Sequence, residues 1–461
     1  MSKSKFTAPV EKNDYLTLQA EDLTHQGLGV CKVDHYPIFV EGLLPGEEAE
    51  VKVTKVGKSF AYGRLMKVLT SSPDRVEVMD KAYTQAGIMP LQHLSYEAQL
   101  RFKKQQVENV LERIAKMPEV PVFDTLGAEN PYHYRNKAQV PVREIDGQLQ
   151  TGFFKRNSHD LIPLEDFQIQ DPEIDRAIIV VRNLLRKYGI KAYDETNHKG
   201  IVRHIMVRRG YYTGELMIVL VTRRSELPHA NELIKGILEE LPETVSIIQN
   251  VNTEKTNVIL GKKSSILYGK DLYTDQLLGY TFEISHQSFY QVNPAQTEVL
   301  YQKVIEYAEL TGEETVIDAY SGIGTISLAL SKKAEHVYGV EIVAPAVENA
   351  KRNAELNGVE NVSFQVGAAE DMMTRWAEAD LTADVLVVDP PRKGLDGKFI
   401  EAAITMQPQR IVYVSCNPST LARDLALLAE GGYKVVKAQP VDLFPQTIHV
   451  ETVVLMSRVD K

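Results

Sequence analysis

The sequence predicts a multidomain α/β protein with a small N-terminal β-barrel, a central α+β domain and a C-terminal Rossmann-like domain. Three observations predict this organisation. Short alternating strands fill residues 15–69, strands and helices mix between 131 and 250, and strands alternate with helices after residue 289. A chain of 461 residues is long enough for about three domains. We expect them at residues 14–72, 73–285 and 286–461.

The N-terminal strands are separated by glycine-rich turns about every ten residues, which is typical of a small β-barrel. One predicted strand face mixes cationic and aromatic side chains, namely Lys52, Lys55, Lys58, Phe60, Tyr62 and Arg64. Such a face can stack bases and contact phosphates. Solvated lysines beside core aromatics would give the same pattern.

A long amphipathic helix over residues 96–116 follows the barrel, and the sequence MPEVP stops it. Further helices near 173–188 and 229–241, between runs of strands, indicate an α+β domain. We expect its strands to expose basic residues: Arg135, Lys137, Lys155, Arg156, Arg203, Arg208 and Arg209. This sheet could face RNA phosphates, or it could be the ordinary solvated face of an antiparallel sheet.

Charge is unevenly distributed along the chain, although the whole carries a net charge of -10, which argues weakly against a nucleic-acid partner. Residues 101–224 contain 21 Lys and Arg against 16 Asp and Glu, whereas residues 286–461 contain 15 against 24. The central part is therefore the basic part. Docking of a polyanion and ordinary surface variation both account for it.

The C-terminal region contains apolar strands that are each followed by helical sequence: ETVIDAY, HVYGVEI, VSFQVG, DVLVVDP and RIVYVSC. This alternation predicts a doubly wound, mostly parallel sheet, in which ligands bind beyond the carboxyl ends of the strands. Several polar residues fall at those ends, namely Asp318, Tyr320, Glu341, Asp389 and Cys416. We therefore expect the functional site at this edge.

The chain has only two cysteines, Cys31 and Cys416, which is too few for a disulfide framework, and no Cys/His spacing suggests a metal site. The first residues lack the apolar core of a secretory signal, and no apolar run is long enough to span a membrane. We expect a cytoplasmic protein with no metal and no membrane segment.

The residues at the first two strand ends favour a particular cofactor. Gly322 and Gly324 follow the first strand, and Glu341 ends the next, where a carboxylate can hold ribose hydroxyls. The missing third glycine and Walker lysine argue against a dinucleotide or a triphosphate. S-adenosylmethionine has a ribose and a cationic sulfonium but no phosphate, and a site lined by Asp318, Glu341 and Asp389 suits it. Tight turns and helix caps would be the structural alternative.

The sequence Asp389-Pro390-Pro391-Arg392 bears on the target atom. Amino-methylating enzymes carry an aromatic residue after a comparable Pro-Pro, so arginine here disfavours an exocyclic nitrogen. The alternative is a pyrimidine carbon. C5 of uracil is hardly nucleophilic until a group adds to C6, and a thiolate can make that addition.

Cys416 is placed to be this nucleophile, although a free cysteine is more often a small buried hydrophobe. It ends a predicted strand, and Asn417 and Pro418 can begin the next helix. The positive potential of a helix N-terminus should favour the thiolate.

The reaction also needs a base for the C5 proton. Glu451 stands among apolar residues in IHVETVVLM, where burial would raise its pKa. We predict Glu451 to be the base, with solvent exposure at the strand end as the alternative.

Five stretches together resemble the S-adenosylmethionine-dependent RNA uracil-5-methyltransferases: DAYSGIGTISLAL, FYQVNPAQTEVLY, DPPRKGL, VSCNPSTLARDL and HVETVVLM. DLTHQGLGVCKV and FVEGLLPGE resemble the TRAM RNA-binding barrel. The resemblance covers essentially the whole chain. It implies catalytic Cys416 and Glu451, and a class I methyltransferase domain whose cofactor contacts Gln291, Tyr320, Glu341 and Asp389. It also implies that helix 96–116 packs on that domain.

The barrel and the sequences PLQHLSYEAQL and YRNKAQVPV favour the 23S ribosomal RNA branch of this family over the transfer RNA branch. We therefore expect a monomer that acts on a loop of 23S ribosomal RNA. A transfer RNA substrate remains an alternative within the family, as does cytosine as the target. A catalytically idle ribosome assembly factor is the alternative from another class.

One departure from the family concerns iron. Cluster-bearing relatives hold a [4Fe-4S] cluster with four cysteines, and the corresponding positions here are Asp80, Ala86, Met89 and Phe167. None can replace a thiolate on iron. We expect no iron-sulfur cluster, with Met89 and Phe167 serving as core.

Overall fold

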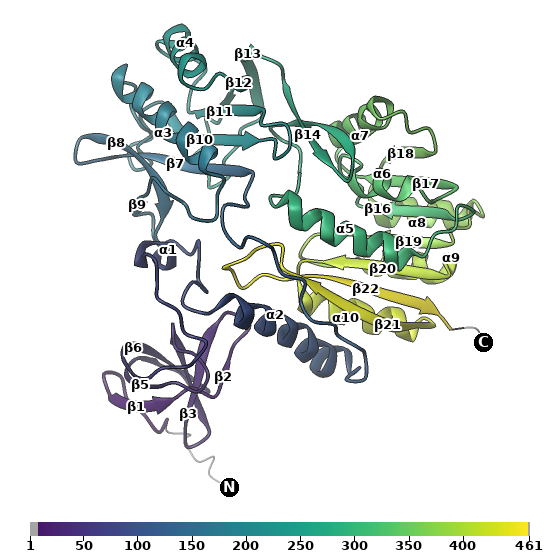
Figure 1. Cartoon of the computed structure of the whole chain (residues 1–461), viewed down its shortest axis with the longest axis horizontal. Coiled ribbons are helices and arrows are strands. Elements are labelled where there is room, and N and C mark those ends of the chain that lie inside the picture. The colour runs from purple at the N-terminus through teal and green to yellow at the C-terminus, as the bar shows by residue number, and fades with distance from the viewer. Residues whose placement is uncertain (1–7, 460–461) are drawn as a thin grey trace.

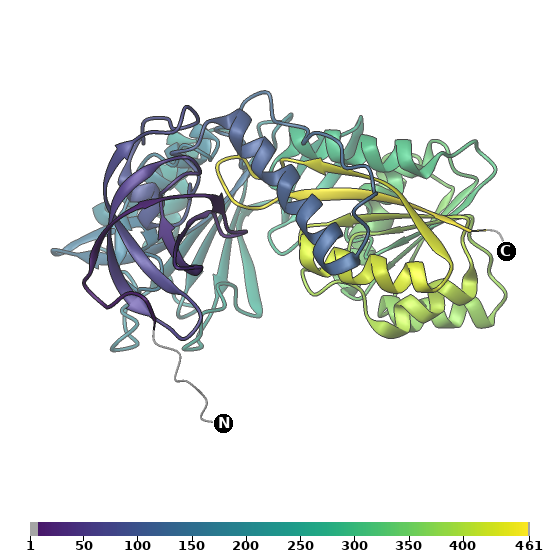
Figure 2. The same cartoon turned by 90° about the horizontal axis from the view of Figure 1, so that it is seen from below.

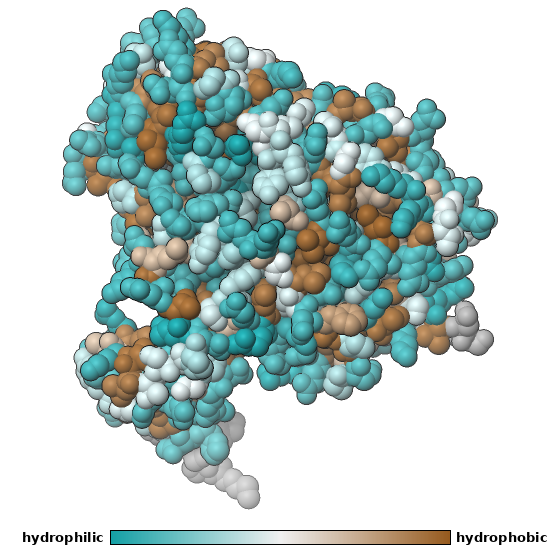
Figure 3. All heavy atoms as spheres, viewed as in Figure 1, coloured by the Kyte–Doolittle hydropathy of each residue, from teal (hydrophilic) through white to brown (hydrophobic). Residues whose placement is uncertain are grey.

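The computed structural model describes residues 8–459 and shows a barrel, a central sheet and a C-terminal sheet, with a long helix between barrel and C-terminal sheet (Figure 1). Hydrophilic and hydrophobic residues are interspersed over the face shown in Figure 3. Of the helices within the described residues, none is long and apolar enough to cross a membrane.

The N-terminal barrel is a six-stranded sheet in the order β1-β5-β6-β4-β3-β2. Alternate residues of β5, including Ala49, Val51 and Val53, point inward and are fully buried, as the alternation in the sequence predicts. The strands are β1 (Tyr15–Gln19), β2 (Asp22–Leu23), β3 (Leu28–Val33), β4 (Tyr36–Glu41), β5 (Glu48–Val56) and β6 (Ala61–Thr70).

A short helix, α1 (Lys81–Gln85), and the long helix α2 (Tyr96–Val110) follow the barrel, and α2 continues as a π-helical turn over Leu111–Ala115. The Ser95 hydroxyl caps α2 by accepting a hydrogen bond from the amide of Ala98. Residues Val107 and Leu111 are buried in the same hydrophobic cluster as side chains of the C-terminal sheet. Figure 2 shows α2 lying against the strands of that sheet.

The central region is a seven-stranded sheet in the order β13-β12-β11-β10-β7-β8-β9, in which only β11 and β12 run parallel. Helices α3 (Pro172–Lys187) and α4 (Ala230–Glu240) pack on one face through a shared hydrophobic cluster. The strands are β7 (Lys137–Ile145), β8 (Gln148–Phe154), β9 (Leu161–Pro163), β10 (Val202–Arg209), β11 (Leu216–Thr222), β12 (Thr244–Val251) and β13 (Lys263–Gly269).

Two of the arginines expected on an exposed face of this sheet are instead buried, so that expectation was wrong for them. Arg203 donates to the carbonyls of Asn252, Glu254 and Thr256, and Arg208 donates to those of Ser285 and Ser288. The sequence pattern could not distinguish a cation facing water from one that holds loop carbonyls inside the protein.

A two-stranded hairpin, β14 (Leu272–Leu277) and β15 (Tyr280–Ser285), joins the central region to the C-terminal region and was not predicted. Its buried residues Tyr273 and Phe282 belong to a cluster that also contains residues of the central and C-terminal sheets. This shared cluster is the packed contact between the two regions.

The C-terminal sheet has the strand order β18-β17-β16-β19-β20-β22-β21, with β22 antiparallel to its neighbours and the other pairs from β18 to β20 parallel. The chain therefore has the doubly wound sheet that the sequence predicts. The strands are β16 (Thr315–Ala319), β17 (His336–Glu341), β18 (Val362–Val366), β19 (Val385–Val388), β20 (Arg410–Ser415), β21 (Tyr433–Val441) and β22 (Glu451–Arg458).

Helices cover both faces of this sheet. One hydrophobic cluster contains residues of α5 (Pro294–Ala308), α6 (Thr325–Ser331) and α7 (Ala344–Leu356). The other contains residues of α8 (Ala369–Glu378), α9 (Gly397–Met406) and α10 (Pro418–Glu430). The strand order reverses between β16 and β19, and the crevice at such a reversal is where ligands bind in this fold.

Candidate active site

Three carboxylates lie together at the carboxyl ends of neighbouring strands. Asp318 is near the end of β16, Glu341 ends β17, and Asp389 directly follows β19. Burial raises the pKa of Asp318 to about 7, and the charges of Asp389 and Glu341 add to this rise. Burial also raises the pKa of Asp389 to about 7. Such a group of carboxylates favours the binding of a cationic ligand.

Glu341 is held in place by backbone amides. Its Oε2 accepts a hydrogen bond of 3.2 Å from Gly322, and its Oε1 accepts one of 2.9 Å from Val343. Gly322 has a φ of 55° and open space on its Cβ side. This turn brings a backbone amide to the carboxylate and leaves room for a ligand beside it.

The hydrogen-bond acceptors at this edge fit S-adenosylmethionine. Asp318 Oδ2 accepts from the Ser327 hydroxyl at 2.5 Å, whereas the buried Oδ1 of the same residue has no hydrogen-bond partner. A buried carboxylate oxygen without a partner is costly unless a ligand satisfies it. The cationic sulfonium and amino groups of the cofactor match the acidic edge, and its ribose diol matches the fixed carboxylate of Glu341.

Gln291 lies close to these carboxylates. Its side chain contacts the hydroxyl of Tyr301, and the charges of Asp389 and Asp318 act on that same tyrosine. The backbone carbonyl of Gln291 accepts a hydrogen bond from Asn136 of the central region at 3.0 Å. The position of this loop therefore depends on two regions of the chain.

Tyr320 has different surroundings. It adopts a left-handed conformation with a φ of 68°, and its ring packs on that of Phe399 with centroids 5.8 Å apart. Burial raises the pKa of its hydroxyl, as do the charges of Glu370, Asp396 and Asp424 rather than those of the strand-end carboxylates.

Cys416 lies between β20 and α10 and is partly exposed. Asn417 caps α10 by accepting a hydrogen bond from the amide of Ser419, and Pro418 begins the helix, as predicted. Burial and the charges of Glu451 and Asp389 raise the pKa of Cys416 to about 11, which opposes the thiolate that the helix N-terminus is expected to favour. The positive charge of Arg392 opposes this rise without overcoming it.

Glu451 is only 4% exposed, so the alternative of a solvated strand end is excluded. The register of β20 and β22 ends with Ser415 opposite Thr452, so Cys416 and Glu451 are the next residues at the same edge of the sheet, and the charge of Glu451 acts on the Cys416 thiol. Burial raises the pKa of Glu451 well above its ordinary value, as the sequence predicted, and the charge of Asp389 adds to it.

Arg392 reaches this site because its loop is tied to α10. Its backbone carbonyl accepts hydrogen bonds from Asn417 Nδ2 at 3.0 Å and Thr420 Oγ1 at 3.2 Å. Gly394 has a φ of 77°, and a Cβ there would lie 2.5 Å from a carboxylate oxygen of Asp424. The loop can therefore approach the helix closely only with glycine at this position.

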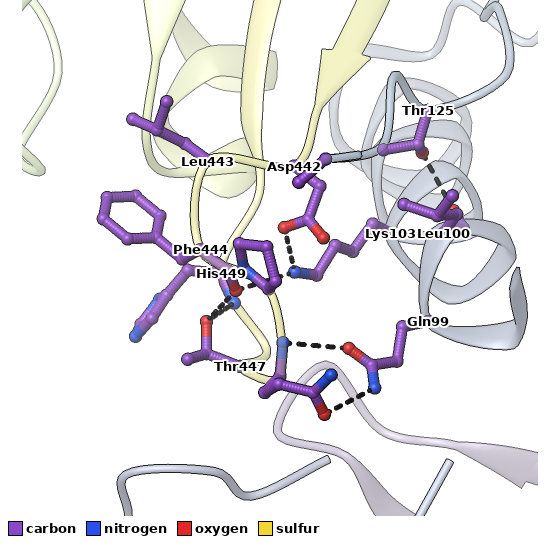
Figure 4. Close-up of polar contacts among 12 residues, drawn as sticks. Gln99, Leu100, Lys103, Thr125, Asp442, Leu443, Phe444, Thr447 and His449 are labelled. Carbon is purple, nitrogen blue, oxygen red and sulfur yellow. Dashed lines mark hydrogen bonds and ion pairs between the residues drawn. The ribbon is translucent and has the colours of Figure 1, made fainter. Parts of the chain in front are cut away.

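The segment 442–450, which leads into Glu451, is held by α2 (Figure 4). Lys103 and Asp442 form a fully buried ion pair of 2.5 Å, and Lys103 also donates to the carbonyl of Phe444. The side chain of Gln99 makes two further hydrogen bonds to Gln446. Gln99 Oε1 accepts one from the backbone N–H of Gln446, and Gln99 Nε2 donates one to the side-chain Oε1 of Gln446. Helix α2 therefore fixes the segment that leads into β22, the strand that begins at Glu451.

A cleft of about 740 Å³ opens at Cys416. It is lined by barrel residues 21–26, by α2 residues between 102 and 110, by residues 416–419 and by residues 448–450. The outer face of the barrel carries a cluster of aromatic rings, in which the centroid of Phe60 is 5.5 Å from that of Phe39 and 5.6 Å from that of Tyr62. The barrel and α2 thus form two walls of the cleft, and a polymer lying in the cleft can reach the thiol.

The positions that correspond to cluster cysteines lie outside this site. Met89 and Phe167 are both fully buried in hydrophobic clusters, and Asp80 caps α1. Within residues 8–459 there is no group of three or more His, Cys, Asp or Glu side chains that could hold a metal ion.

Sequence reasoning missed Lys103, Asp442 and His449. Burial and the nearby charges of Arg392 and Lys103 lower the pKa of His449, a cleft residue, to about 4. The only sequence signal was a lysine on the apolar side of helix 96–116, and nothing in it pointed to a partner at residue 442.

Comparison with known proteins gives two matching families. The tRNA (Uracil-5-)-methyltransferase family matches residues 95–459, and the TRAM domain matches residues 9–66. An uncharacterised RNA methyltransferase of Enterococcus faecalis is 58% identical, with 98% of each chain covered. One from Bacillus cereus strain ATCC 10987 is 54% identical, covering 99% of this chain and all of its own.

Among solved structures, the tRNA (uracil-54, C5)-methyltransferase of Pyrococcus abyssi in complex with S-adenosyl-L-homocysteine is similar to this chain. The TM-score is 0.77 and the identity 28%, with 96% of this chain and all of the other covered. A match of this extent reaches into the N-terminal barrel. The barrel therefore does not separate ribosomal from transfer RNA substrates, contrary to the expectation from the sequence.

Proposed function

The chain belongs to the tRNA (Uracil-5-)-methyltransferase family and is an S-adenosylmethionine-dependent RNA uracil-5-methyltransferase, and from this premise we propose that it methylates uridine in 23S ribosomal RNA. In this proposal Cys416 is the nucleophile and Glu451 the base. The observation that carries it is a buried carboxylate, Glu451, close enough for its charge to act on the thiol of Cys416, which lines the cleft.

Cys416 supplies what uracil lacks. Addition of its sulfur to C6 moves the electrons of the C5–C6 double bond onto C5 and O4, which makes C5 nucleophilic. S-adenosylmethionine, when bound, supplies the methyl group. Because burial and nearby carboxylates raise the pKa of Cys416 to about 11 in the RNA-free protein, the thiol must pass its proton to solvent in the cleft as the ring binds, before the sulfur adds to C6. The charge of Arg392 favours the thiolate at that stage.

Glu451 then removes the proton from C5, and the electrons of that bond expel the Cys416 sulfur from C6. A carboxylate whose pKa is raised is a stronger base once it is ionised. Each turnover thus ends with a free thiol and 5-methyluridine.

Gln291, Tyr320, Glu341 and Asp389 would hold the cofactor. The fixed carboxylate of Glu341 suits the ribose diol, and Gln291 and Asp389 lie by the adjoining strand ends. For Tyr320, the support is the family resemblance and its place directly after β16, because its ring packs on Phe399. We propose no iron-sulfur cluster, since the four corresponding positions carry no thiol. Stoichiometric iron in anaerobically purified protein would contradict this.

The support for 23S ribosomal RNA is the resemblance of PLQHLSYEAQL and YRNKAQVPV to that branch. The reacting uracil must leave its stack to reach Cys416, so an unpaired loop is the expected substrate. Transfer RNA is the second candidate, because the similar Pyrococcus enzyme acts on tRNA. Cytosine as the target and an idle assembly factor are disfavoured by the family and by the paired Cys416 and Glu451.

Mass spectrometry of RNA from cells that lack the protein tests this proposal. Ribosomal and transfer RNA are separated and digested, and 5-methyluridine is quantified in each. We expect the loss in 23S ribosomal RNA, and its return when the wild-type gene, but not the Cys416→Ala gene, is restored. A loss confined to transfer RNA would replace the proposed substrate, and no loss in either fraction would overturn the proposal.

A further inference from the structure

The central sheet has a second face that carries polar residues at alternate positions. Lys137, Gln139, Pro141 and Arg143 share this face of β7, because side chains alternate along a strand. On the neighbouring β10, His204 lies opposite Pro141. Helices α3 and α4 cover the other face.

A pocket of about 400 Å³ is formed on this face at the end of β7 that carries Arg143. The loop containing Lys255 and the ends of β8 and β10 complete its walls. It lies apart from the cleft at Cys416, since the two share no lining residue.

Planar groups alternate along one wall of the pocket. The guanidinium of Arg143 lies 5.1 Å from the ring centroid of Phe154 and 5.8 Å from that of Tyr193. The guanidinium of Arg203 lies 4.4 Å from the same Tyr193 centroid. Aromatic rings and arginine planes are the surfaces on which proteins stack unpaired bases.

The pocket also holds polar atoms without partners. His204 Nδ1 is buried and makes no hydrogen bond, and the same holds for Arg203 Nε. The amide of Gln139 reaches only the sulfur of Met206, at 3.3 Å. Buried polar groups normally have partners, so these atoms point to a ligand with hydrogen-bonding edges.

We propose that this pocket binds a nucleobase of the RNA substrate, at a distance from the uridine at Cys416. A base offers flat faces for the wall and polar edges for Gln139 and His204. The pocket has three cationic side chains, Arg143, Arg203 and Lys255, and one carboxylate, Glu195. This excess of positive charge suits the phosphate group of a nucleotide whose base occupies the pocket. The inference rests on RNA being the substrate and does not depend on which RNA it is.

Strand β7 sets the distance between the pocket and the active site. Asn136, just before β7, touches the Gln291 loop at the active site, and Arg143 lies seven residues further along. At about 3.3 Å per residue this is roughly 23 Å. Lys137 lies between, opposite Arg208, and burial with the charges of Arg208 and Arg135 lowers its pKa to about 8. A phosphate of the connecting backbone would relieve that repulsion.

Photocrosslinking tests the proposal directly. 23S ribosomal RNA fragments and transfer RNAs, transcribed with 4-thiouridine, are irradiated with the full-length enzyme, and crosslinked peptides are mapped. Methyl incorporation in the same tubes identifies the productive RNA, so a wrong substrate assignment is recognised separately. We expect crosslinks to the peptides of Phe154 and Tyr193 with the productive RNA. Crosslinks confined to the barrel and the Cys416 cleft would overturn the proposal.

Variants provide a second readout. Phe154→Ala should raise the RNA concentration for half-maximal rate by roughly 5- to 150-fold, the range for loss of one stacked base, and leave the rate at saturating RNA unchanged. Phe154→Tyr should restore binding. Phe123→Ala removes an exposed aromatic outside the pocket and is the matched control. Equal half-saturation for Phe154→Ala and the control would contradict the assignment.

Discussion

The two cysteines of the chain lie in two regions that differ in almost everything except the pKa of the thiol. Cys31 is fully buried in the barrel core, and Cys416 is partly exposed where the C-terminal sheet meets the cleft. Both thiols have a pKa of about 11. The causes differ, because burial and Glu21 raise the first, whereas burial, Glu451 and Asp389 raise the second against Arg392.

In the proposed mechanism Cys416 is the nucleophile although its thiol pKa equals that of Cys31, so in that mechanism the pKa of a resting thiol does not identify the nucleophile. The helix N-terminus after Cys416 favours the thiolate, but burial and two carboxylates outweigh it. The two sites differ in solvent access, because Cys31 is fully buried and Cys416 is partly exposed. They also differ in their neighbours, because only Cys416 lies near both an arginine, Arg392, and the proposed base, Glu451. The following predictions test that distinction.

The largest difference should come from replacing each cysteine by alanine, which removes the sulfur. Cys416→Ala should reduce methylation to the detection limit and abolish any covalent RNA adduct, because no C6 addition can occur. Cys31→Ala should keep full activity and lose about 1 kcal/mol of unfolding free energy through a small cavity. Methyl incorporation and denaturant unfolding measure the two effects. Residual C5 methylation by Cys416→Ala would remove the covalent mechanism.

The second test removes the base and keeps the thiol. Glu451→Gln should slow product release by about 10²- to 10⁴-fold, so methylated RNA accumulates as an adduct on denaturing gels. In the wild type, release should accelerate as pH rises, because the raised pKa keeps Glu451 protonated at lower pH. Release at the wild-type rate by Glu451→Gln would assign the base to another residue.

The support that α2 gives to the segment before β22 can be tested with two adjacent lysines. Lys103→Met leaves Asp442 buried without its cation and should cost about 3 to 5 kcal/mol of unfolding free energy. Lys104→Met breaks an exposed pair with Asp124 and should cost at most about 1 kcal/mol. Urea unfolding of both variants gives the comparison, and equal losses would contradict the role of the buried pair.

Glu341 should affect the cofactor and not the thiol. Glu341→Gln should weaken S-adenosylmethionine binding by roughly 10- to 150-fold, the effect of losing one hydrogen bond to a charged acceptor. Calorimetry measures it. Alkylation of Cys416 should stay unchanged, since the charge of Glu341 is not among those that set its pKa. Unaltered cofactor affinity would contradict the assignment.

The smallest effect concerns thiol reactivity in the free protein. Between pH 7 and 10, alkylation of Cys416 by iodoacetamide should rise about tenfold per pH unit, because its thiolate forms only near a pKa of about 11. Cys31 should stay unmodified in the folded chain. Glu451→Gln should shift the Cys416 curve to lower pH by removing a negative charge. Mass spectrometry of the two peptides reads both sites, and an unshifted curve would mean that Glu451 does not act on the thiol.

The sequence predicted the parts of this molecule whose signals are local. Alternating residues of β5, the cap of α10 at Asn417 and the strand-end carboxylates could be predicted because each depends on neighbours in the sequence. The buried pair of Lys103 and Asp442 could not, because its partners are distant. The burial of Arg203 and Arg208 depends on loop carbonyls that no periodicity reveals.

The separation between Lys103 and Asp442 has a consequence for how the enzyme is made. The two residues are 339 positions apart, so the helix leaves the ribosome long before the segment it must hold. Until then its ammonium group has no carboxylate partner, and the helix cannot be buried in its final place. Strand β22, which begins at Glu451, follows every other described strand in the chain and is therefore synthesised after them. A nascent chain that has not yet reached residue 442 therefore already contains the barrel and most strands of the C-terminal sheet, but it lacks both Asp442 and the proposed base, Glu451.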